Sequence, residues 1–249
     1  MRIKVISLSS STRRRASIEA QLLKVDAPFE FSDAITPEES LRHVHHYDER
    51  EFLLNCGRVA TAGEIACYAS HLALWEQCAR GNDPYLILED DAELDQAFLA
   101  GLLVVASQIQ KRGLVRVSLP DVSDSFTIDD LGRFKIQYCR RVPLLALGYA
   151  LSPDAAARLA AAGRTVEEPV DKYMQRFWRH QQPVYAMVPP VVRLAKVAAE
   201  SEIGERRRPR YRLSTWAGRA VRKIENTIAR TRFNLGQHFA LLQSDSKAP

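Results

Sequence analysis

The sequence is short of the features that mark membrane-spanning, secreted and zinc-binding proteins. Its four cysteines form no CxxC pair and have no histidines at zinc spacing, so we expect buried free thiols in a reducing compartment. Apolar runs such as residues 101–106 and 142–151 are far shorter than the roughly 20 residues of a spanning helix. Residues 1–8 have neither a long apolar region nor a cleavage site, and they resemble a first strand more than a signal peptide. These absences predict a cytoplasmic protein.

The charge of the 249-residue chain is uneven. Its formal net charge is +5, but arginines and lysines crowd the last fifth of the chain, over residues 206–232. The remainder is about neutral to acidic, so the basic character belongs to an appendage. We therefore divide the chain into a domain over residues 1–200 and a basic linker and tail over residues 201–249. The 46% hydrophobic content allows the domain to bury a sizeable core.

Strand and helix patterns alternate along the domain. Residues 2–8 are rich in branched side chains and predict a strand, and residues 13–25 carry an apolar stripe that predicts a helix. Residues 61–79 open with a capping-box pattern, Thr61-Ala62-Gly63-Glu64, and continue with apolar residues at helical spacing. The alternation predicts an α/β fold with a single Rossmann-like, mostly parallel sheet flanked by helices. Residues 121–130 have a turn-like composition, and residues 37–56 show no clear pattern.

The most informative pattern is a short apolar run, residues 84–88, followed by Glu89, Asp90 and Asp91. The run has the length of a buried parallel strand, and ligands collect outside the carboxyl ends of such strands. On an extended chain, Glu89 and Asp91 point to one face and Asp90 to the other. Oxygen ligands suit Mn²⁺ or Mg²⁺, so we predict a metal site with Asp91 as the first ligand and Glu89 beside it. The alternative is a solvated acidic turn that favours a following helix.

Two arginines lie at the start of the first predicted helix. Arg14 and Arg15 follow a polar turn, and a helix N-terminus favours anions. Arginine binds phosphate oxygens in bidentate fashion, so we predict that both contact a phosphate group. The alternative is a solvated helical face.

The basic tail contains an amphipathic pattern. Over residues 213–233, Trp216, Ala220, Ile224 and Ile228 fall on one stripe among arginines, which predicts a helix. Such a helix suits an anionic membrane surface, here the cytoplasmic face of the inner membrane, and the alternative is that it packs back on the domain. Basic composition alone supports a nucleic-acid partner only weakly, and we expect none.

Six blocks of the sequence form an ordered set. They are residues 5–14, 63–75, 87–91, 148–152 and 169–174, and a strand centred on Pro189. The second block reads Gly-Glu-Ile-Ala-Cys-Tyr-Ala-Ser-His over residues 63–71, followed by Trp75. In this order and spacing the blocks resemble bacterial glycosyltransferase family 25, the enzymes of lipooligosaccharide biosynthesis. The resemblance covers most of residues 2–203.

The resemblance implies a GT-A-like fold and a reaction. Members move a hexose, often galactose, from a UDP-sugar to a glycan or glycolipid hydroxyl with inversion at the anomeric carbon. The matching blocks assign donor contacts to Ser7, Leu8, Ser70 and His71, although Ser7 stands where the family pattern has Asn. A lone helical histidine is more often structural, which is the alternative for His71. Asp90 is assigned to the ribose or sugar hydroxyls of the donor.

Inversion by direct displacement needs a base that removes the acceptor hydroxyl proton. Asp171 is the first candidate because it follows a Pro-Val turn, precedes an aromatic helical stretch and falls in a matching block. Glu167 and Glu168 are rivals by proximity in sequence. The alternative is that Asp171 caps the helix that follows it.

Two other functions use the same features. Carboxylates at a strand end would also serve a nucleotidyltransferase or another phosphoryl-transfer enzyme, although the sequence has no GxxxxGK[ST] phosphate loop. A non-catalytic module that binds membrane or nucleic acid through its basic tail is the third hypothesis. The leading hypothesis is a metal-dependent glycosyltransferase.

Overall fold

The computed structural model describes residues 1–118, 124–195 and 213–245. Its strands are β1 (Arg2–Ser7), β2 (Phe29–Asp33), β3 (His46–Tyr47), β4 (Tyr85–Glu89), β5 (Ala92–Leu94), β6 (Leu114–Arg116), β7 (Ser125–Leu131), β8 (Phe134–Cys139), β9 (Gly148–Leu151), β10 (Thr165–Val166), β11 (Tyr185–Val188) and β12 (Val192–Leu194). Its helices are α1 (Thr12–Lys24), the 3-10 helix η1 (Ser40–Arg42), α2 (Glu49–Cys56), α3 (Ala62–Arg80), α4 (Phe98–Arg112), α5 (Pro153–Ala162), α6 (Val170–Met174), α7 (Phe177–His180) and α8 (Leu213–Asp245).

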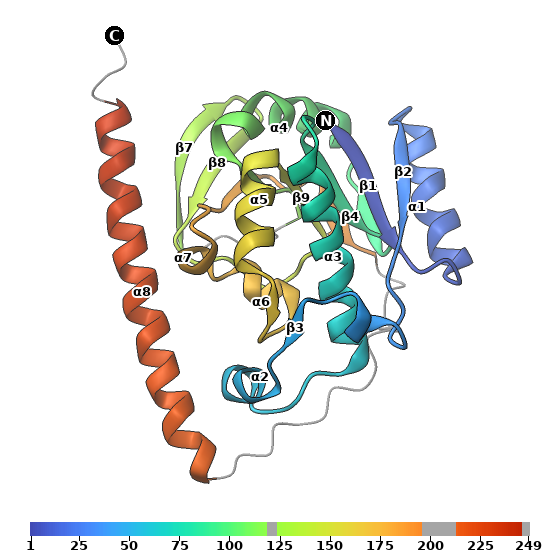
Figure 1. Cartoon of the computed structure of the whole chain (residues 1–249). Coiled ribbons are helices and arrows are strands. Elements are labelled where there is room, and N and C mark those ends of the chain that lie inside the picture. Colours follow the sequence, from blue (N-terminus) through green and yellow to red (C-terminus); the bar gives the residue numbers. More distant parts are fainter. Residues whose placement is uncertain (119–123, 196–212, 246–249) are drawn as a thin grey trace.

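An eight-stranded sheet forms the centre of the molecule, in the order β2-β1-β4-β9-β6-β11-β8-β7 (Figure 1). β1 pairs in parallel with β2 and β4, and β6 pairs in parallel with β11. β9 runs antiparallel to both of its neighbours, and β8 runs antiparallel to both of its own. Six of the eight strands therefore share one direction, which confirms the predicted α/β class and the largely parallel sheet.

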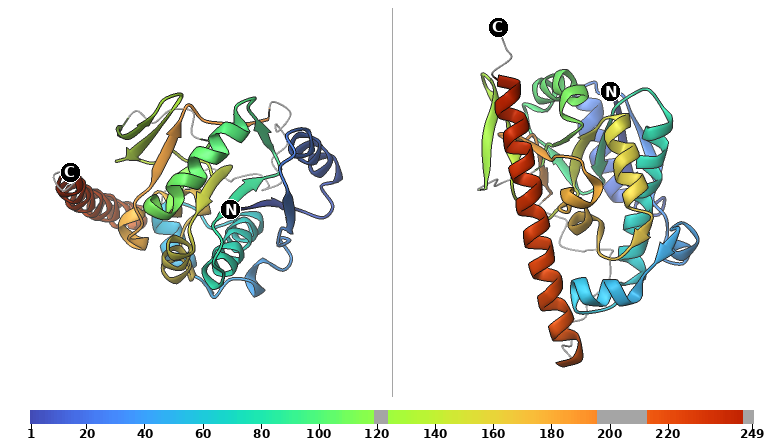
Figure 2. Two further views of the ribbon diagram at one scale, coloured as in Figure 1. Left: turned by 90° about the horizontal axis from the view of Figure 1, so that it is seen from above. Right: turned by 60° about the vertical axis from the view of Figure 1, so that its left-hand side comes forward.

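Helices cover both faces of this sheet (Figure 2). Alternate residues of β4 show how the strands serve two cores: Tyr85 and Ile87 pack with α3, α5 and α6, whereas Leu86 and Leu88 pack with α1 and α4. Burial on both faces explains the unbroken apolar run that precedes the acidic residues. Because β1 and β4 are parallel, their carboxyl ends meet at one edge of the sheet.

Two stretches differ from the sequence-based expectation. The prediction of a turn at residues 121–130 is wrong for the described part, because residues 125–131 form β7, an edge strand paired with β8. Long-range pairing overrides the low strand propensity of Asp129 and Asp130 there. The unreadable stretch at residues 37–56 contains η1, β3 and α2. The linker predicted at 201–212 lies outside the described residues, and the division at residue 200 stays a prediction.

The tail forms the long helix α8, which lies along the domain. One side packs on it: Arg222 pairs with Glu51 of α2, and the rings of Phe233 and Phe177 lie 5.1 Å apart. The other side is exposed and apolar, at Val221, Ile224, Ile228, Leu235 and Phe239. Packing against the domain, one of the two alternatives for this helix, thus holds for one face. No helix within the described residues combines the length and the hydropathy that crossing a membrane requires.

Candidate active site

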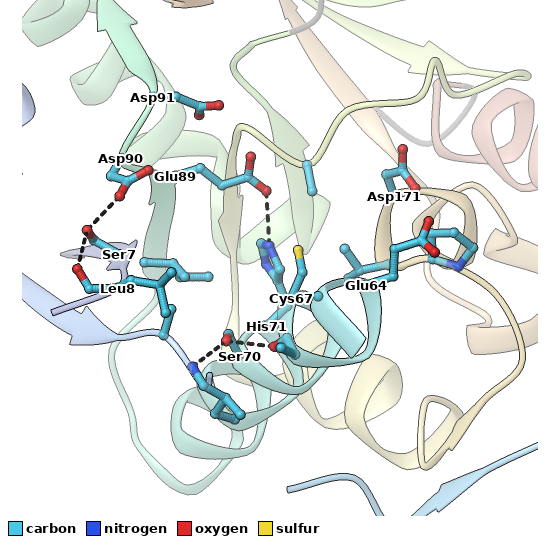
Figure 3. Close-up of a pocket in the computed structure, with 18 of the residues that line it drawn as sticks. Ser7, Leu8, Glu64, Cys67, Ser70, His71, Glu89, Asp90, Asp91 and Asp171 are labelled. Atoms are coloured by element: carbon cyan, nitrogen blue, oxygen red, sulfur yellow. Dashed lines mark hydrogen bonds and ion pairs between the residues drawn. The ribbon is translucent and has the colours of Figure 1, made fainter. Parts of the chain in front are cut away.

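A cavity of about 340 Å³ opens where the parallel strands β1 and β4 end (Figure 3). Its wall includes the ends of these strands, the first turn of α1, the chain after β2, the first half of α3, α6, the segment before β9, and β12. Nine of the ten residues predicted for the site line it: Ser7, Leu8, Arg14, Ser70, His71, Glu89, Asp90, Asp91 and Asp171. The fold therefore brings together residues separated by up to 164 positions in the sequence.

The three carboxylates occupy a strand end and a turn. β4 ends at Glu89, and Asp90 and Asp91 form a turn before β5, so the expectation of an extended chain through Asp91 is wrong. All three still line the cavity. Asp90 accepts a hydrogen bond of 2.6 Å from the Ser7 hydroxyl, and its other oxygen lies 3.5 Å from a nitrogen of Arg14. Asp90 is thus the carboxylate of the three that the protein itself neutralises.

Asp91 carries charge that the protein does not compensate in the same way. Its Oδ1 atom is buried and has no hydrogen-bond partner among the described residues. Burial, followed by the negative charges of Glu89 and Asp90, raises the pKa of Asp91 to about 7. A hard divalent cation would relieve both the desolvation and the repulsion, and the carboxylate oxygens here are the donors that Mn²⁺ and Mg²⁺ prefer. The residues present therefore fit such a cation.

Glu89 is held by a buried polar chain. Its Oε1 lies 3.2 Å from Nε2 of His71, and Nδ1 of His71 lies 2.8 Å from the Tyr149 hydroxyl. The same hydroxyl accepts a 2.8 Å hydrogen bond from the indole of Trp75. His71 lines the cavity, yet both of its ring nitrogens face protein partners, and its exposed fraction is 0%.

Two other predicted donor contacts have structural partners. The Ser70 hydroxyl accepts from the backbone N–H of Ile35 at 2.9 Å and donates to a carbonyl of its own helix, which ties the chain after β2 to α3. Arg15 does not line the cavity. Its guanidinium donates to the carbonyls of Ser7 and Leu8 and pairs with Asp33, so it braces the end of β1.

Asp171 lies on the α6 side of the cavity, opposite Ser7 and Asp90 in Figure 3. The N-cap residue of α6 is Pro169, so the alternative that Asp171 caps this helix is wrong. One carboxylate oxygen of Asp171 accepts a hydrogen bond of 2.8 Å from the backbone N–H of Lys172. This contact orients the carboxylate at the wall of the cavity.

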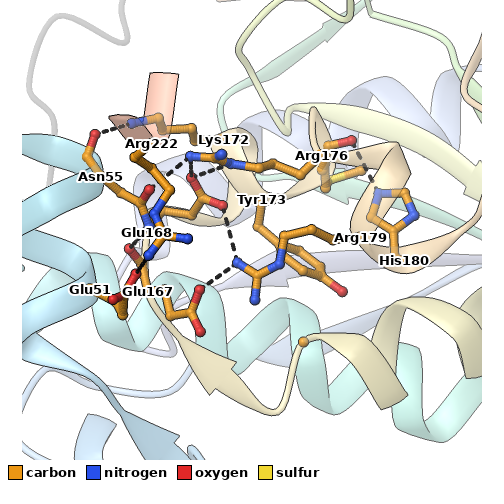
Figure 4. Close-up of polar contacts among 12 residues, drawn as sticks. Glu51, Asn55, Glu167, Glu168, Lys172, Tyr173, Arg176, Arg179, His180 and Arg222 are labelled. Atoms are coloured by element: carbon orange, nitrogen blue, oxygen red, sulfur yellow. Dashed lines mark hydrogen bonds and ion pairs between the residues drawn. The ribbon is translucent and has the colours of Figure 1, made fainter. Parts of the chain in front are cut away.

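The rival acids belong to a separate ionic network, drawn in Figure 4. Glu168 is 1% exposed and pairs with Arg176 at 2.7 Å, and Glu167 pairs with Arg179 at 2.5 Å. Neither glutamate lines the cavity. The structure thus favours Asp171 over both rivals, on position alone.

Sequence reasoning missed two further features near the carboxylates. The first is a possible ligand set: ligand atoms of Cys67, His71 and Glu89 lie within 4.8 Å of one another. In the sequence, the four-residue spacing of Cys67 and His71 already put both residues on one face of a helix.

The second feature is Arg116 in β6, which is fully buried. Its three guanidinium nitrogens have no hydrogen-bond partner among the described residues. Burial lowers the pKa of Arg116. A lone arginine in a strand pattern gives no sequence signal for such a position.

Comparison with known proteins identifies the class. Residues 1–174 match the family described as glycosyltransferase family 25 (LPS biosynthesis protein), which covers more than half of the chain and every predicted site residue. The chain therefore belongs to glycosyltransferase family 25, as the sequence blocks indicated.

Individual relatives match over a shorter segment. The chain is 37% identical over 94 residues to the lipooligosaccharide biosynthesis protein lic2B of Haemophilus influenzae, which is 37% of this chain and 34% of the relative. It is 38% identical over 93 residues to the lacto-N-neotetraose biosynthesis glycosyltransferase LgtB of Neisseria gonorrhoeae, which is 37% of this chain and 33% of the relative. The matched segment thus spans about a third of each of these relatives.

Proposed function

We propose that this protein is a metal-dependent hexosyltransferase of lipooligosaccharide or lipopolysaccharide assembly. The donor is a UDP-sugar, with galactose as the first candidate, and the acceptor is a hydroxyl of a glycan or glycolipid. Membership of glycosyltransferase family 25 and the relatives named for lipooligosaccharide and lacto-N-neotetraose biosynthesis support this assignment.

The observation that carries the proposal is the cavity at the ends of β1 and β4. Three carboxylates line one side, and Asp171 stands on the α6 side. A sugar nucleotide needs stabilisation of its departing diphosphate and, for direct displacement, a base near the acceptor hydroxyl. The cavity offers groups for both tasks.

The first task falls to Asp91 and Glu89 as metal ligands. The orphaned Oδ1 of Asp91 and the excess negative charge around it support this choice. Bound Mn²⁺ or Mg²⁺ would neutralise charge that develops on the leaving diphosphate. Arg14 would add a fixed positive charge for phosphate oxygens, and Ser7 and Asp90 would contact donor hydroxyls; their mutual contacts at the cavity wall support these roles.

The second task falls to Asp171. As the base, its carboxylate takes the proton of the acceptor hydroxyl while that oxygen attacks the anomeric carbon, so the product has the inverted configuration. Proton transfer by a positioned base contributes about 10²–10⁴-fold to a rate. We therefore expect Asp171→Asn to lower kcat by about that factor.

Release of UDP from UDP-hexoses with Mn²⁺ and a glycan acceptor tests the function, and proton NMR of the product reads its anomeric configuration. Glu167→Gln is the matched control, because Glu167 lies nearby in sequence but in the outer ionic network. Equal activity of Asp171→Asn and wild type would remove Asp171 as the base, and a retained configuration would remove the single displacement.

The same assay separates the rival functions. A nucleotidyltransferase would release pyrophosphate instead of UDP. A non-catalytic module would release neither, and UDP-sugars would not raise its melting temperature.

We also propose that the exposed face of α8 contacts an anionic membrane on its cytoplasmic side. The stripe of Val221, Ile224, Ile228, Leu235 and Phe239 lies outward, and residues 213–245 contain five basic and two acidic residues. An apolar stripe with a cationic surplus suits the headgroup region of such a membrane. Glycolipid acceptors would be found at that surface.

A further inference from the structure

Three buried residues and the partly exposed Glu89 form a continuous hydrogen-bonded chain that ends at the cavity. Trp75 and His71 lie one turn apart on α3, Tyr149 comes from β9, and Glu89 ends β4. The three links measure 2.8 Å, 2.8 Å and 3.2 Å. Trp75, Tyr149 and His71 each have an exposed fraction of 0%, so water does not compete for the two bonds among them.

The chemistry of the donors fixes the direction of this chain. Indole nitrogen only donates, so the Tyr149 oxygen accepts from Trp75, and its hydroxyl proton remains for His71 Nδ1. With Nδ1 as the acceptor, the ring carries its proton on Nε2, which faces Glu89. Each group then donates one hydrogen bond to the next group, and no contact has a hydrogen on both of its atoms.

We infer that His71 is a positioning residue whose Nε2–H donates to Glu89 and fixes this carboxylate for its ligand. The inference rests on the proposed function in so far as the ligand is a cation. Figure 3 shows the second Glu89 oxygen turned away from His71. One oxygen is thus tied to the protein while the other stays available. A ligand held in this way loses less side-chain freedom on binding a cation, and such outer partners typically contribute 10–100-fold to metal affinity.

Cys67 offers the competing arrangement, a soft cation held by Cys67, His71 and Glu89. A cation there would require the Cys67 thiol to lose its proton, because the thiolate is the ligand form of cysteine. A cation on His71 would also require Nε2 to lose its proton and the Tyr149 hydroxyl to find another acceptor. The hydrogen-bonded chain accounts for every proton without these changes.

Nitrogen NMR tests the tautomer without any activity measurement. In uniformly ¹⁵N-labelled full-length protein, long-range ¹H–¹⁵N spectra distinguish Nδ1–H from Nε2–H rings, and His71→Gln identifies the His71 signals by their loss. We expect a proton on Nε2 and none on Nδ1, which accepts from Tyr149. A proton found on Nδ1 would overturn the inference.

Calorimetric titration with Mn²⁺ tests the consequence. We expect Tyr149→Phe, which leaves the ring unfixed, and His71→Leu, which removes the donor, to weaken Mn²⁺ binding by about 10–100-fold. His71→Gln keeps an N–H donor and should stay closer to wild type. Tyr68→Phe is the matched control, since Tyr68 is an equally buried tyrosine whose hydroxyl bonds the Gly163 carbonyl instead.

The outcomes separate this inference from the proposed function. If Tyr149→Phe and Tyr68→Phe bind Mn²⁺ equally, the positioning role is wrong even if the enzyme is active. If wild type binds no Mn²⁺, the metal part of the proposed function fails. The NMR measurement of the His71 tautomer then tests the hydrogen-bonded chain by itself. Binding of one Co²⁺ with a thiolate charge-transfer band that Cys67→Ser abolishes would establish the site of Cys67, His71 and Glu89. That result would overturn the inference about His71.

Discussion

At the scale of single residues, Asp91 lowers the stability of the metal-free protein and, in the proposed function, serves as a metal ligand. Its buried, repelled carboxylate has a pKa raised to about 7, which means that the charged form destabilises the folded protein. We expect Asp91→Asn to stabilise the metal-free protein by about 1–2 kcal/mol after allowance for its partial exposure. The same change should weaken Mn²⁺ binding at least about tenfold.

Urea denaturation and Mn²⁺ calorimetry measure the two effects of Asp91→Asn. Asp83→Asn is a suitable control, because Asp83 precedes the opposite end of β4 and makes an exposed pair with Arg2. A variant that lost stability and kept its Mn²⁺ affinity would show that Asp91 has a structural role.

His180 should make stability depend on pH. It is 2% exposed, and burial lowers its pKa to about 4 from the ordinary value of 6.5. The unfolded chain therefore takes up a proton below pH 6.5 that the folded chain refuses until about pH 4, so the free energy of unfolding falls across this window. The loss amounts to roughly 3 kcal/mol and is complete below pH 4.

Urea denaturation of wild type and His180→Gln between pH 7.5 and 4 measures this linkage. The unfolding free energy of wild type should fall relative to that of His180→Gln as the pH falls. Only wild type has a histidine at this position that is protonated in the unfolded chain and not in the folded protein. Parallel curves would show that His180 is protonated equally in both states.

At the scale of elements, the start of α3 supports one wall of the cavity. Thr61 accepts from the backbone N–H of Glu64 at 3.1 Å, and Glu64 accepts in return from the backbone N–H of Thr61 at 3.1 Å. The capping box predicted from four sequence letters is thus confirmed. We expect Thr61→Ala to lower the free energy of unfolding by about 1 kcal/mol, measured by urea denaturation. A change below 0.3 kcal/mol, on the order of measurement error, would mean that Arg58, bound to Glu64, holds this end unaided.

The elements that the sequence predicts best are those whose signals are local. α3 and α5 start with their own caps, and the apolar run of β4 ends at its acids, so each could be located without the rest of the fold. β7 could not, because its stability comes from pairing with β8 and not from its Asp-rich sequence. β9 is similar: its residues predict a strand, but not its insertion antiparallel between β4 and β6.

At the scale of the whole molecule, some features of the site follow from local sequence, and others depend on pairing between distant strands. Ordered blocks of sequence predicted nine of the residues that line the cavity, because each block follows a strand or opens a helix at one edge of the sheet. The bond between His71 and Tyr149 joins residues 78 positions apart, and only the insertion of β9 beside β4 creates it. The orientation of Glu89 was therefore beyond the sequence, although its place in the site was not.

The two faces of α8 have different surroundings. Residues such as Phe233 and Arg222 tie the helix to the domain, whereas Val221, Ile224 and Ile228 point outward and are about half exposed. Replacing these three outward residues with Gln should leave the melting temperature within about 2 °C, because no core contact is lost. It should lower binding to vesicles that contain phosphatidylglycerol by at least about 100-fold, since burying each aliphatic side chain contributes roughly 1.5–3 kcal/mol.

Vesicle flotation and light scattering separate membrane binding from self-association through the same face. Thr227→Gln with Thr231→Gln is the matched control, because both threonines are exposed polar neighbours on α8. Binding to anionic vesicles that the control keeps and the triple variant loses would support the membrane proposal. A dimer that the triple variant dissociates, without vesicle binding by wild type, would instead assign the apolar stripe to a second copy of the chain, and anionic lipid would then have no part in placing the cavity near its acceptor.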